Sequence, residues 1–198
     1  MGADLITLNE YKTSENLSSL ENDSRLESLI ASISQLVKTY CGNSFIDYVS
    51  VDKVEEFSLD YYTPRLQVTE SPLISVSTVQ ERSRYGADYV TLDENNYEYY
   101  VDAANDLIVR TSSNGYVDWP QGPGCVIVTY RAGYQAVPED LKLAVIDLVN
   151  YYYKDEYKPR RTIGSSSMTN DPSSTQWRNV GFPDHIKRVL DLYKQIQV

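Results

Sequence analysis

Apolar side chains recur every three or four residues between Asp23 and Cys41, which is the period of one buried face of an α-helix. Asp23 is a favourable N-cap, and Gly42 follows the last periodic residue, where glycine most easily ends a helix. The pattern therefore predicts a helix over about 23–41. Before it, Thr7 and Glu10 have the spacing of a capping box and predict a short helix to about residue 13. The periodic positions of the longer helix are Leu26, Leu29, Ile30, Ile33, Leu36, Val37 and Tyr40.

The same period returns after residue 137. Pro138 suits the first turn of a helix, and Glu139 and Asp140 suit its positive end, so we predict a helix over about 138–157 that Pro159 ends. A last helix is predicted over about 183–195. Residues 159–182 lack an apolar period and are rich in Ser, Thr, Asn, Pro and Gly, which predicts a long flexible loop. The periodic positions are Leu141, Ala144, Val145, Leu148, Val149 and Tyr152, then Ile186, Val189, Leu190 and Tyr193.

Between about residue 45 and residue 134 the apolar period changes to two. Val49, Val51 and Val54 open this region, and short segments dominated by Tyr, Val, Thr and Ile follow, as is typical of half-buried strands. Turn signals separate the segments at 85–86, 93–96, 114–115 and 122–124. Short strands joined by turns predict an antiparallel sheet or a small barrel. The expected strands are 66–68, 72–80, 89–92, 97–101, 107–110 and 126–130.

These elements together predict an α+β fold, in which a small helical bundle carries an inserted antiparallel β-sheet or barrel module. We expect residues 1–44 and 135–158 to form the helical core and residues 45–134 to form the inserted β module. Residues 159–182 would be the flexible loop, and residues 183–198 the C-terminal helix and tail.

Charge is distributed unevenly along the chain. Residues 1–153 hold 10 Lys and Arg against 23 Asp and Glu, which gives −13, whereas residues 154–198 hold 8 against 5, which gives +3. An acidic body argues against ordinary nucleic-acid binding, which requires clustered cations, and it suits a surface that must not adhere to DNA. The basic segment could dock on an acidic partner, although solvated surface explains both charges equally well.

Targeting and redox signals are weak. Cys41 and Cys125 are too few for a disulfide scaffold, and we expect both to be buried thiols. The N-terminus lacks the basic and apolar regions of a signal peptide, and no apolar run approaches the roughly 20 residues that a membrane span needs. We therefore expect a protein that is made and used inside a cell and binds no membrane.

The residues give little support for catalysis. His185, the one histidine, lies beside Asp184 at a predicted helix start, and we expect it on the surface. The two cysteines stand 84 residues apart and lack the close spacing of zinc ligands. No phosphate-binding glycine motif is present. We therefore predict no catalytic, cofactor-binding or metal-binding residues, and no cofactor.

Two clusters of acidic residues could be functional sites, and each also has a simpler explanation. Asp102, Asn105 and Asp106 could hold a cation through oxygen ligands, although such residues more often form a turn. The carboxylates of Glu55–Glu56 and Glu98 could act as an acid–base pair, although chance adjacency in an acidic chain explains them better.

Tyrosine is abundant, with 18 residues. A sugar-binding or interface surface is one interpretation, and packing of core and sheet is the other. The consecutive Tyr151, Tyr152 and Tyr153 cannot all face one core, so we predict that this cluster contributes to a subunit interface. A sugar-binding protein would expose tryptophan or tyrosine in a groove, and the tryptophans are Trp119 and Trp177.

The order of these parts resembles the tailed-phage head–tail connector family, also called adaptor or head completion proteins, in the longer form with a β insertion. The resemblance covers nearly the whole chain. Its most specific part is Ala132-Gly-Tyr134 followed by Val137-Pro-Glu-Asp-Leu-Lys142 at the start of a helix, which is a structural signature. The other matching segments are 5–12, 26–45, 71–79, 85–89, 119–120, 126–131 and 182–190.

The resemblance implies a structural subunit of the phage neck that forms a ring, usually twelvefold, beneath the portal protein. The ring would join the portal to the stopper or tail-completion protein and surround the DNA channel without sequence-specific binding. The subunit would be made in the host cytoplasm and reside at the head–tail junction of the virion. In this family the C-terminal segment reaches the portal, so the docking candidates are Arg160, Arg161, Arg178, Lys187, Arg188 and Lys194.

Two other classes remain as alternatives. The chain could be another virion or tail component, such as a stopper or a carbohydrate-binding module. An enzyme would need a concave pocket with converging titratable groups, which nothing in the residues suggests.

Overall fold

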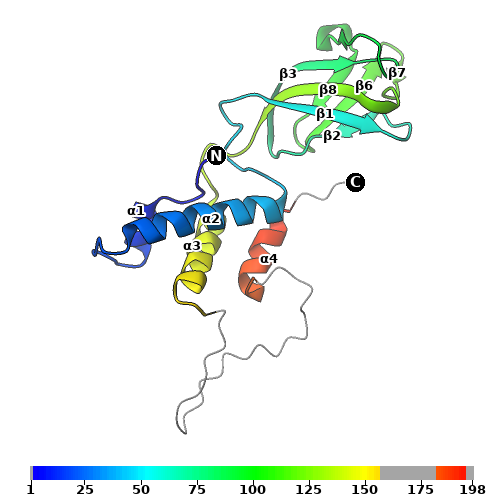
Figure 1. The fold of residues 1–198 in the computed structure, drawn as a ribbon. Helices are drawn as coiled ribbons and strands as arrows, with labels where there is room; N and C mark the ends of the chain where they lie inside the picture. Colours follow the sequence, from blue (N-terminus) through cyan, green and yellow to red (C-terminus); the bar gives the residue numbers. More distant parts are fainter. Residues whose placement is uncertain (1, 157–181, 195–198) are drawn as a thin grey trace. The chain divides into compact units, whose positions relative to one another are not determined.

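A computed structural model describes residues 2–156 and 182–194, which contain four helices and two antiparallel sheets (Figure 1). The α+β fold class is therefore confirmed. The chain divides into two compact units. The helical unit contains residues 4–41 and 137–194, and the β-unit contains residues 42–136 together with the extreme N-terminus.

The helical unit is built from α1 (Leu8–Ser14), α2 (Asp23–Cys41), α3 (Glu139–Tyr153) and α4 (Asp184–Leu192). The capping box at α1 forms as predicted, because Thr7 accepts from the Glu10 N–H and the Glu10 carboxylate accepts from the Thr7 N–H. None of these helices combines the length and the apolar character that a membrane span requires. The buried side chains of the core are Leu5, Ile6, Tyr11, Leu26, Ile30, Ile33, Val37, Cys41, Leu141, Ala144, Val145, Leu148, Val149, Phe182, Ile186 and Leu190.

Two helices end earlier than predicted. The helix predicted to reach residue 157 ends at Tyr153, because Asp155 adopts a left-handed backbone with φ of 54°. The N–H groups of Lys154, Asp155 and Glu156 bond back onto carbonyls of the last turn, as in a helix C-terminus. The last helix ends at Leu192 rather than near residue 195. The predicted flexible loop, residues 159–182, lies outside the described residues apart from Phe182.

The β-unit contains two antiparallel sheets (Figure 1). One has the order β1 (Lys53–Leu59), β8 (Gly122–Ala132), β3 (Leu73–Glu81) and β4 (Val90–Thr91). The other has the order β2 (Arg65–Gln67), β6 (Leu107–Ser112) and β5 (Tyr99–Asp102), with β7 (Gly115–Tyr116) paired to β6. A 3-10 turn, Glu94–Asn96, precedes β5. The core that both sheets share contains Leu66, Val68, Leu73, Val79, Leu92, Tyr99, Ile108, Trp119, Cys125, Val126, Val128, Tyr130 and Ala132.

The first strand begins later than the valine pattern predicts. Val49 and Val51 lie in an irregular segment, and β1 starts at Lys53. In β1 every second residue is half-buried, and two of these positions are Lys53 and Glu55 rather than apolar residues. A strand whose inward positions are charged has no apolar alternation, so the pattern placed the strand too early.

The two ends of the β-unit run beside each other in close contact. The Tyr134 N–H donates to the Phe45 carbonyl at 2.7 Å, and the Ala132 N–H donates to the Tyr48 carbonyl at 3.2 Å. Gly133 lies at this contact with φ of 116°, and a Cβ there would be 2.2 Å from the Phe45 carbonyl oxygen. Only glycine fits both this backbone conformation and this distance.

The two cysteines lie in different units and can report on each separately. Cys41 is fully buried in the helical unit and Cys125 in the β-unit, and both are free thiols. Burial, followed by the charge of Asp191, raises the pKa of Cys41 to about 12. The thiolate is the reactive form.

We expect neither cysteine to react with a maleimide at pH 8 until its unit opens, as mass spectrometry of the digested protein would show. Rapid labelling of Cys41 in native buffer would contradict this packing.

The close approach at Gly133 predicts a specific loss of stability. Gly133→Ala should destabilise the β-unit by more than about 3 kcal/mol, because it adds a steric clash to an unfavourable backbone conformation. Gly115→Ala is the matched control, since Gly115 has φ of 122° and a Cβ added there would have no atom within 4 Å. That variant should lose only about 1–3 kcal/mol. Maleimide labelling of Cys125 at increasing denaturant concentration measures the stability of the β-unit in both variants. Equal losses of stability in Gly133→Ala and Gly115→Ala would show that the structure relieves the clash at Gly133.

Candidate functional site

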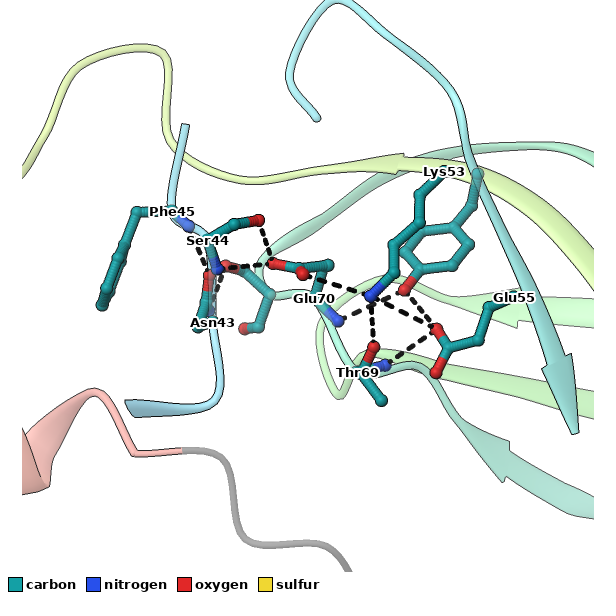
Figure 2. A network of polar contacts seen from close by, with 9 residues as sticks. Asn43, Ser44, Phe45, Lys53, Glu55, Thr69 and Glu70 are labelled. Carbon is teal, nitrogen blue, oxygen red and sulfur yellow. Dashed lines mark hydrogen bonds and ion pairs between the residues drawn. The ribbon is translucent and has the colours of Figure 1, made fainter. Parts of the chain in front are cut away.

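A buried polar network lies where the chain enters the β-unit (Figure 2). At its centre is Glu70, which is 8% exposed and follows β2. One of its oxygens accepts from the Ser44 N–H at 2.8 Å and from the Ser44 hydroxyl at 2.6 Å. The other accepts from the Lys53 ammonium at 3.1 Å. We call the set Asn43, Ser44, Lys53, Glu55, Thr69, Glu70 and Tyr130 the Glu70 network.

A second carboxylate completes this arrangement. Glu55 accepts from the Tyr130 hydroxyl at 2.5 Å and from the Thr69 N–H at 3.3 Å, and it lies 3.9 Å from the Lys53 ammonium. The Tyr130 oxygen also accepts from the Glu70 N–H at 3.3 Å. Burial, followed by the hydrogen bond to Glu55, raises the pKa of Tyr130, so its hydroxyl remains a neutral donor.

The network fixes the irregular segment that precedes β1. Asn43 donates to the Ser71 carbonyl at 2.8 Å and accepts from the Phe45 N–H at 2.7 Å. Phe45 is held in a left-handed conformation with φ of 63°. Each carboxylate of the network therefore binds backbone N–H groups and one shared cation, which stabilises chain geometry and leaves no carboxylate poised for acid–base chemistry.

The acid–base pair considered for Glu55–Glu56 and Glu98 is not assembled. Glu55 is half-buried and Glu56 exposed, since they alternate along β1. Glu98 accepts from the Asp93 N–H at 2.7 Å. Among residues 2–156 and 182–194, no group of three or more His, Cys, Asp or Glu side chains could hold a metal ion.

The residues considered for a cation site form the turn between β5 and β6. Asn105 donates to the Asp102 carboxylate at 2.8 Å. The Asp106 carboxylate accepts from the Ser71 hydroxyl and the Leu73 N–H, both at 2.6 Å. Asp106 thus fixes the start of β3, and the turn interpretation accounts for it.

For the sugar-binding alternative, the structure replaces the tryptophans by tyrosines as the candidate contact residues. Trp119 is 1% exposed in the core, so it cannot stack on a sugar, and Trp177 lies outside the described residues. The exposed aromatic side chains of the β-unit are tyrosines instead, and sequence reasoning named none of them individually. They are Tyr61, Tyr62, Tyr85, Tyr97, Tyr100 and Tyr116.

Three of the docking candidates lie on or just after α4. The Lys187 ammonium is 2.7 Å from the Asp191 carboxylate, and this hydrogen bond raises the pKa of Lys187 and lowers that of Asp191. Lys194 lies 4.9 Å from the centre of the Tyr40 ring. Arg188 is exposed, and within the described residues it has no ion-pair partner. Arg160, Arg161 and Arg178 lie outside the described residues. His185 is exposed in the first turn of α4.

The interface candidates lie at the end of α3. Tyr151, Tyr152 and Tyr153 are all half-buried. The Tyr151 and Tyr152 rings meet edge to face at 5.5 Å, and the Arg25 guanidinium lies 5.1 Å from the Tyr153 ring. A role for them between subunits stays a prediction.

Two hollows lie in the β-unit. A groove of about 700 Å³ separates the edge strands β1 and β2, with Phe57, Leu66 and Val68 among its lining residues. A second hollow, of about 560 Å³, is lined by Glu94, Tyr97, Tyr99, Tyr100, Thr111, Ser112 and Ser113. We call the second one the Tyr97 hollow.

The Glu70 network predicts a stability effect that is confined to the β-unit. Glu70→Gln keeps the shape but removes a charge that faces the largely buried Lys53 ammonium, so it should cost about 1–3 kcal/mol. Glu56→Gln, on the exposed face of β1, the strand that carries Lys53, is the control and should cost little. In Glu70→Gln, maleimide should label Cys125 faster than in the unchanged protein, whereas the labelling rate of Cys41 should stay the same. An unchanged Cys125 rate in Glu70→Gln would show that the network does not stabilise this unit.

Known proteins resemble the chain along nearly its whole length. The head completion protein of Escherichia phage T5 is 25% identical over 193 residues, which cover 97% of this chain and 99% of that protein. Among solved structures, a chain from the neck of an empty gene transfer agent particle, computed with C6 symmetry, has a TM-score of 0.59 at 14% identity and covers 98% of this chain and 91% of its own.

A chain from the neck of the native particle, computed with C12 symmetry, has a TM-score of 0.54 at 15% identity and covers 100% of this chain and 97% of its own. At these identities the two structures show a shared fold. The model of the family described as "Head completion protein" matches residues 4–196. That match confirms the resemblance found in the sequence, and the chain belongs to the head completion protein family.

Proposed function

We propose that the chain is a structural subunit of a phage neck, where it forms a ring that joins the portal to the stopper or tail and surrounds the DNA channel. The observation that carries this proposal is the family match over residues 4–196, because it includes both units and not one shared module. The phage T5 relative has nearly the same length and is itself a head completion protein.

The solved relatives support a ring. Their necks were computed with C6 and C12 symmetry, and chains of this fold occur in both. Cyclic rings of more than two copies use head-to-tail interfaces, so each subunit must offer two different faces. We propose a ring of twelve subunits, with Tyr151, Tyr152 and Tyr153 at one of these faces.

The charge of the β-unit suits a wall along which DNA slides. Residues 42–136 hold 14 Asp and Glu against 6 Lys and Arg. Three of those cations are already paired within the unit: Lys53 with Glu70, Arg110 with Glu81 and Arg131 with Asp52. A surface with so few free cations cannot neutralise phosphates, so it would not hold the passing genome.

The basic segment beyond residue 153 is the proposed portal contact. Arg188 is exposed and has no partner among the described residues, whereas Lys187 is engaged with Asp191. Arg188, together with Arg160, Arg161 and Arg178, could contact an acidic portal surface. Complementary charge would accelerate the association and set its orientation.

Deleting the C-terminal part would not test the portal contact by itself, because the deletion would also affect the fold. Phe182, Ile186 and Leu190 of the α4 region are buried, and the Cys41 thiol contacts the Leu190 carbonyl at 3.6 Å. A chain lacking residues 159–198 would lose part of the helical core, so charge substitutions are the better test.

Native mass spectrometry of the purified chain, alone and mixed with the portal, tests the proposal directly. We expect a portal complex whose mass corresponds to a ring of subunits. Replacing Arg160, Arg161, Arg178 and Arg188 by Glu should lower the affinity for the portal by roughly tenfold or more, mainly through slower association. Arg84→Glu, an exposed change on the β-unit, is the control for the effect of charge alone.

Two results would contradict the proposal. A chain that stays monomeric and ignores the portal would favour another tail component. Equal affinity of the fourfold variant and the Arg84→Glu variant would remove the basic segment from the portal contact.

A further inference from the structure

The Tyr97 hollow has walls of exposed aromatic rings around a buried one. Tyr97 is 71% exposed and Tyr100 57% exposed, whereas Tyr99 between them is 8% exposed and belongs to the core. The hydroxyl-bearing side chains of Thr111, Ser112 and Ser113 also line it. Large exposed aromatics around a concave surface are typical of binding sites rather than of ordinary solvated surface.

Folding alone does not explain a tyrosine at position 97. Its φ is 59°, a left-handed conformation that asparagine or glycine adopts at lower cost. Hydrogen bonds hold it there: its N–H donates to the Glu94 carbonyl at 3.0 Å, and its carbonyl accepts from the Thr111 hydroxyl at 2.8 Å. The chain thus keeps an exposed ring on an unfavourable backbone, with no core contact that requires it.

The hollow is electrostatically suited to a cation. Glu94 is one of its lining residues, and the faces of tyrosine rings attract positive charge. Burial, followed by the charges of Glu94 and Asp93, raises the pKa of Tyr99, which is consistent with a negative potential at this position. No Lys or Arg of residues 2–156 and 182–194 lies over the rings of Tyr97, Tyr99 or Tyr100.

The same unit contains an occupied arrangement of this kind. The Arg82 guanidinium lies 5.1 Å from the Tyr85 ring and 4.8 Å from the Tyr89 ring, and it donates to the Pro123 carbonyl at 2.7 Å. Two tyrosine rings and a nearby oxygen acceptor therefore accommodate one guanidinium on this scaffold. The Tyr97 hollow offers tyrosine rings and Glu94, and no described guanidinium or ammonium lies over those rings. The neighbouring Arg110 donates to the Glu98 and Thr111 carbonyls and is paired with Glu81.

We propose that the Tyr97 hollow binds an arginine side chain of a partner protein, with the guanidinium stacked on Tyr97 and Tyr100 and hydrogen-bonded to Glu94. Arginine fits better than lysine, because a planar group can stack on a ring and donate to a carboxylate at once. This proposal is independent of the proposed portal contact, which involves the basic segment beyond residue 153.

The test is an NMR titration of the full ¹⁵N-labelled chain with N-acetyl-arginine amide. The matched probe is N-acetyl-citrulline amide, which has nearly the same shape without the charge. We expect arginine to shift the amide resonances of residues 94–100 and 111–113, and citrulline to bind about tenfold more weakly. Glu94→Gln should weaken arginine binding by about the same factor.

A second variant separates binding from folding. Tyr97→Asn should leave the stability of the β-unit unchanged or raise it, because asparagine tolerates the left-handed backbone, yet it should abolish the arginine-induced shifts. Tyr116→Ala, which removes an exposed ring outside the hollow, should retain them.

Three outcomes would overturn the proposal. One is the absence of any shift in these resonances up to about 100 mM arginine amide. Another is equal binding of arginine and citrulline. The third is a methyl glycoside that shifts the same resonances while arginine does not, which would assign the hollow to a sugar.

Discussion

Residues 42–136 of the β-unit are inserted between α2 and α3, two helices that pack against each other, so the two ends of this stretch must lie close together. The contact between Phe45 and Gly133 is where they meet. A Cβ at Gly133 would lie 2.2 Å from the Phe45 carbonyl oxygen, and the next residue donates its N–H to that same oxygen. The two strands nearest these ends, β1 and β8, pair with each other along most of β1. The closure at the ends therefore brings the first and last strands of the larger sheet side by side.

Closure of this kind requires an entry segment of defined shape, and the Glu70 network supplies it. Ser44 and left-handed Phe45 lie outside any helix or strand, so their N–H groups donate to the side chains of Glu70 and Asn43 instead. Two carboxylates and one ammonium are costly to bury, and the hydrogen bonds to Ser44, Thr69 and Tyr130 offset that cost only in this one arrangement. We interpret the network as the feature that selects a single path into the sheet.

Local patterns in the sequence predicted the elements that depend on local physics. The amphipathic period located α2 with its observed bounds, and the capping residues located α1. The start of β1 was missed because Lys53 and Glu55 occupy inward positions, and their partners Glu70 and Tyr130 are 17 and 75 residues away. The Tyr97 hollow was equally hidden, since it depends on a left-handed residue and on β6, which pairs with β5. Contacts of this range leave no periodic signal in the chain.

The distribution of polar groups separates two tasks, the stabilisation of the fold and the contact with partners, that the proposed ring subunit would have to combine. Charged side chains that are largely buried, such as Lys53, Glu70 and Arg110, are paired inside the β-unit and stabilise its shape. Arg188 on α4 and the rings of Tyr97 and Tyr100 are exposed and have no ion-pair or ring partner among residues 2–156 and 182–194, so the fold does not depend on their size. They lie on separate units, one acidic and one with a basic end, and the proposed place between portal and tail would require two such unlike faces.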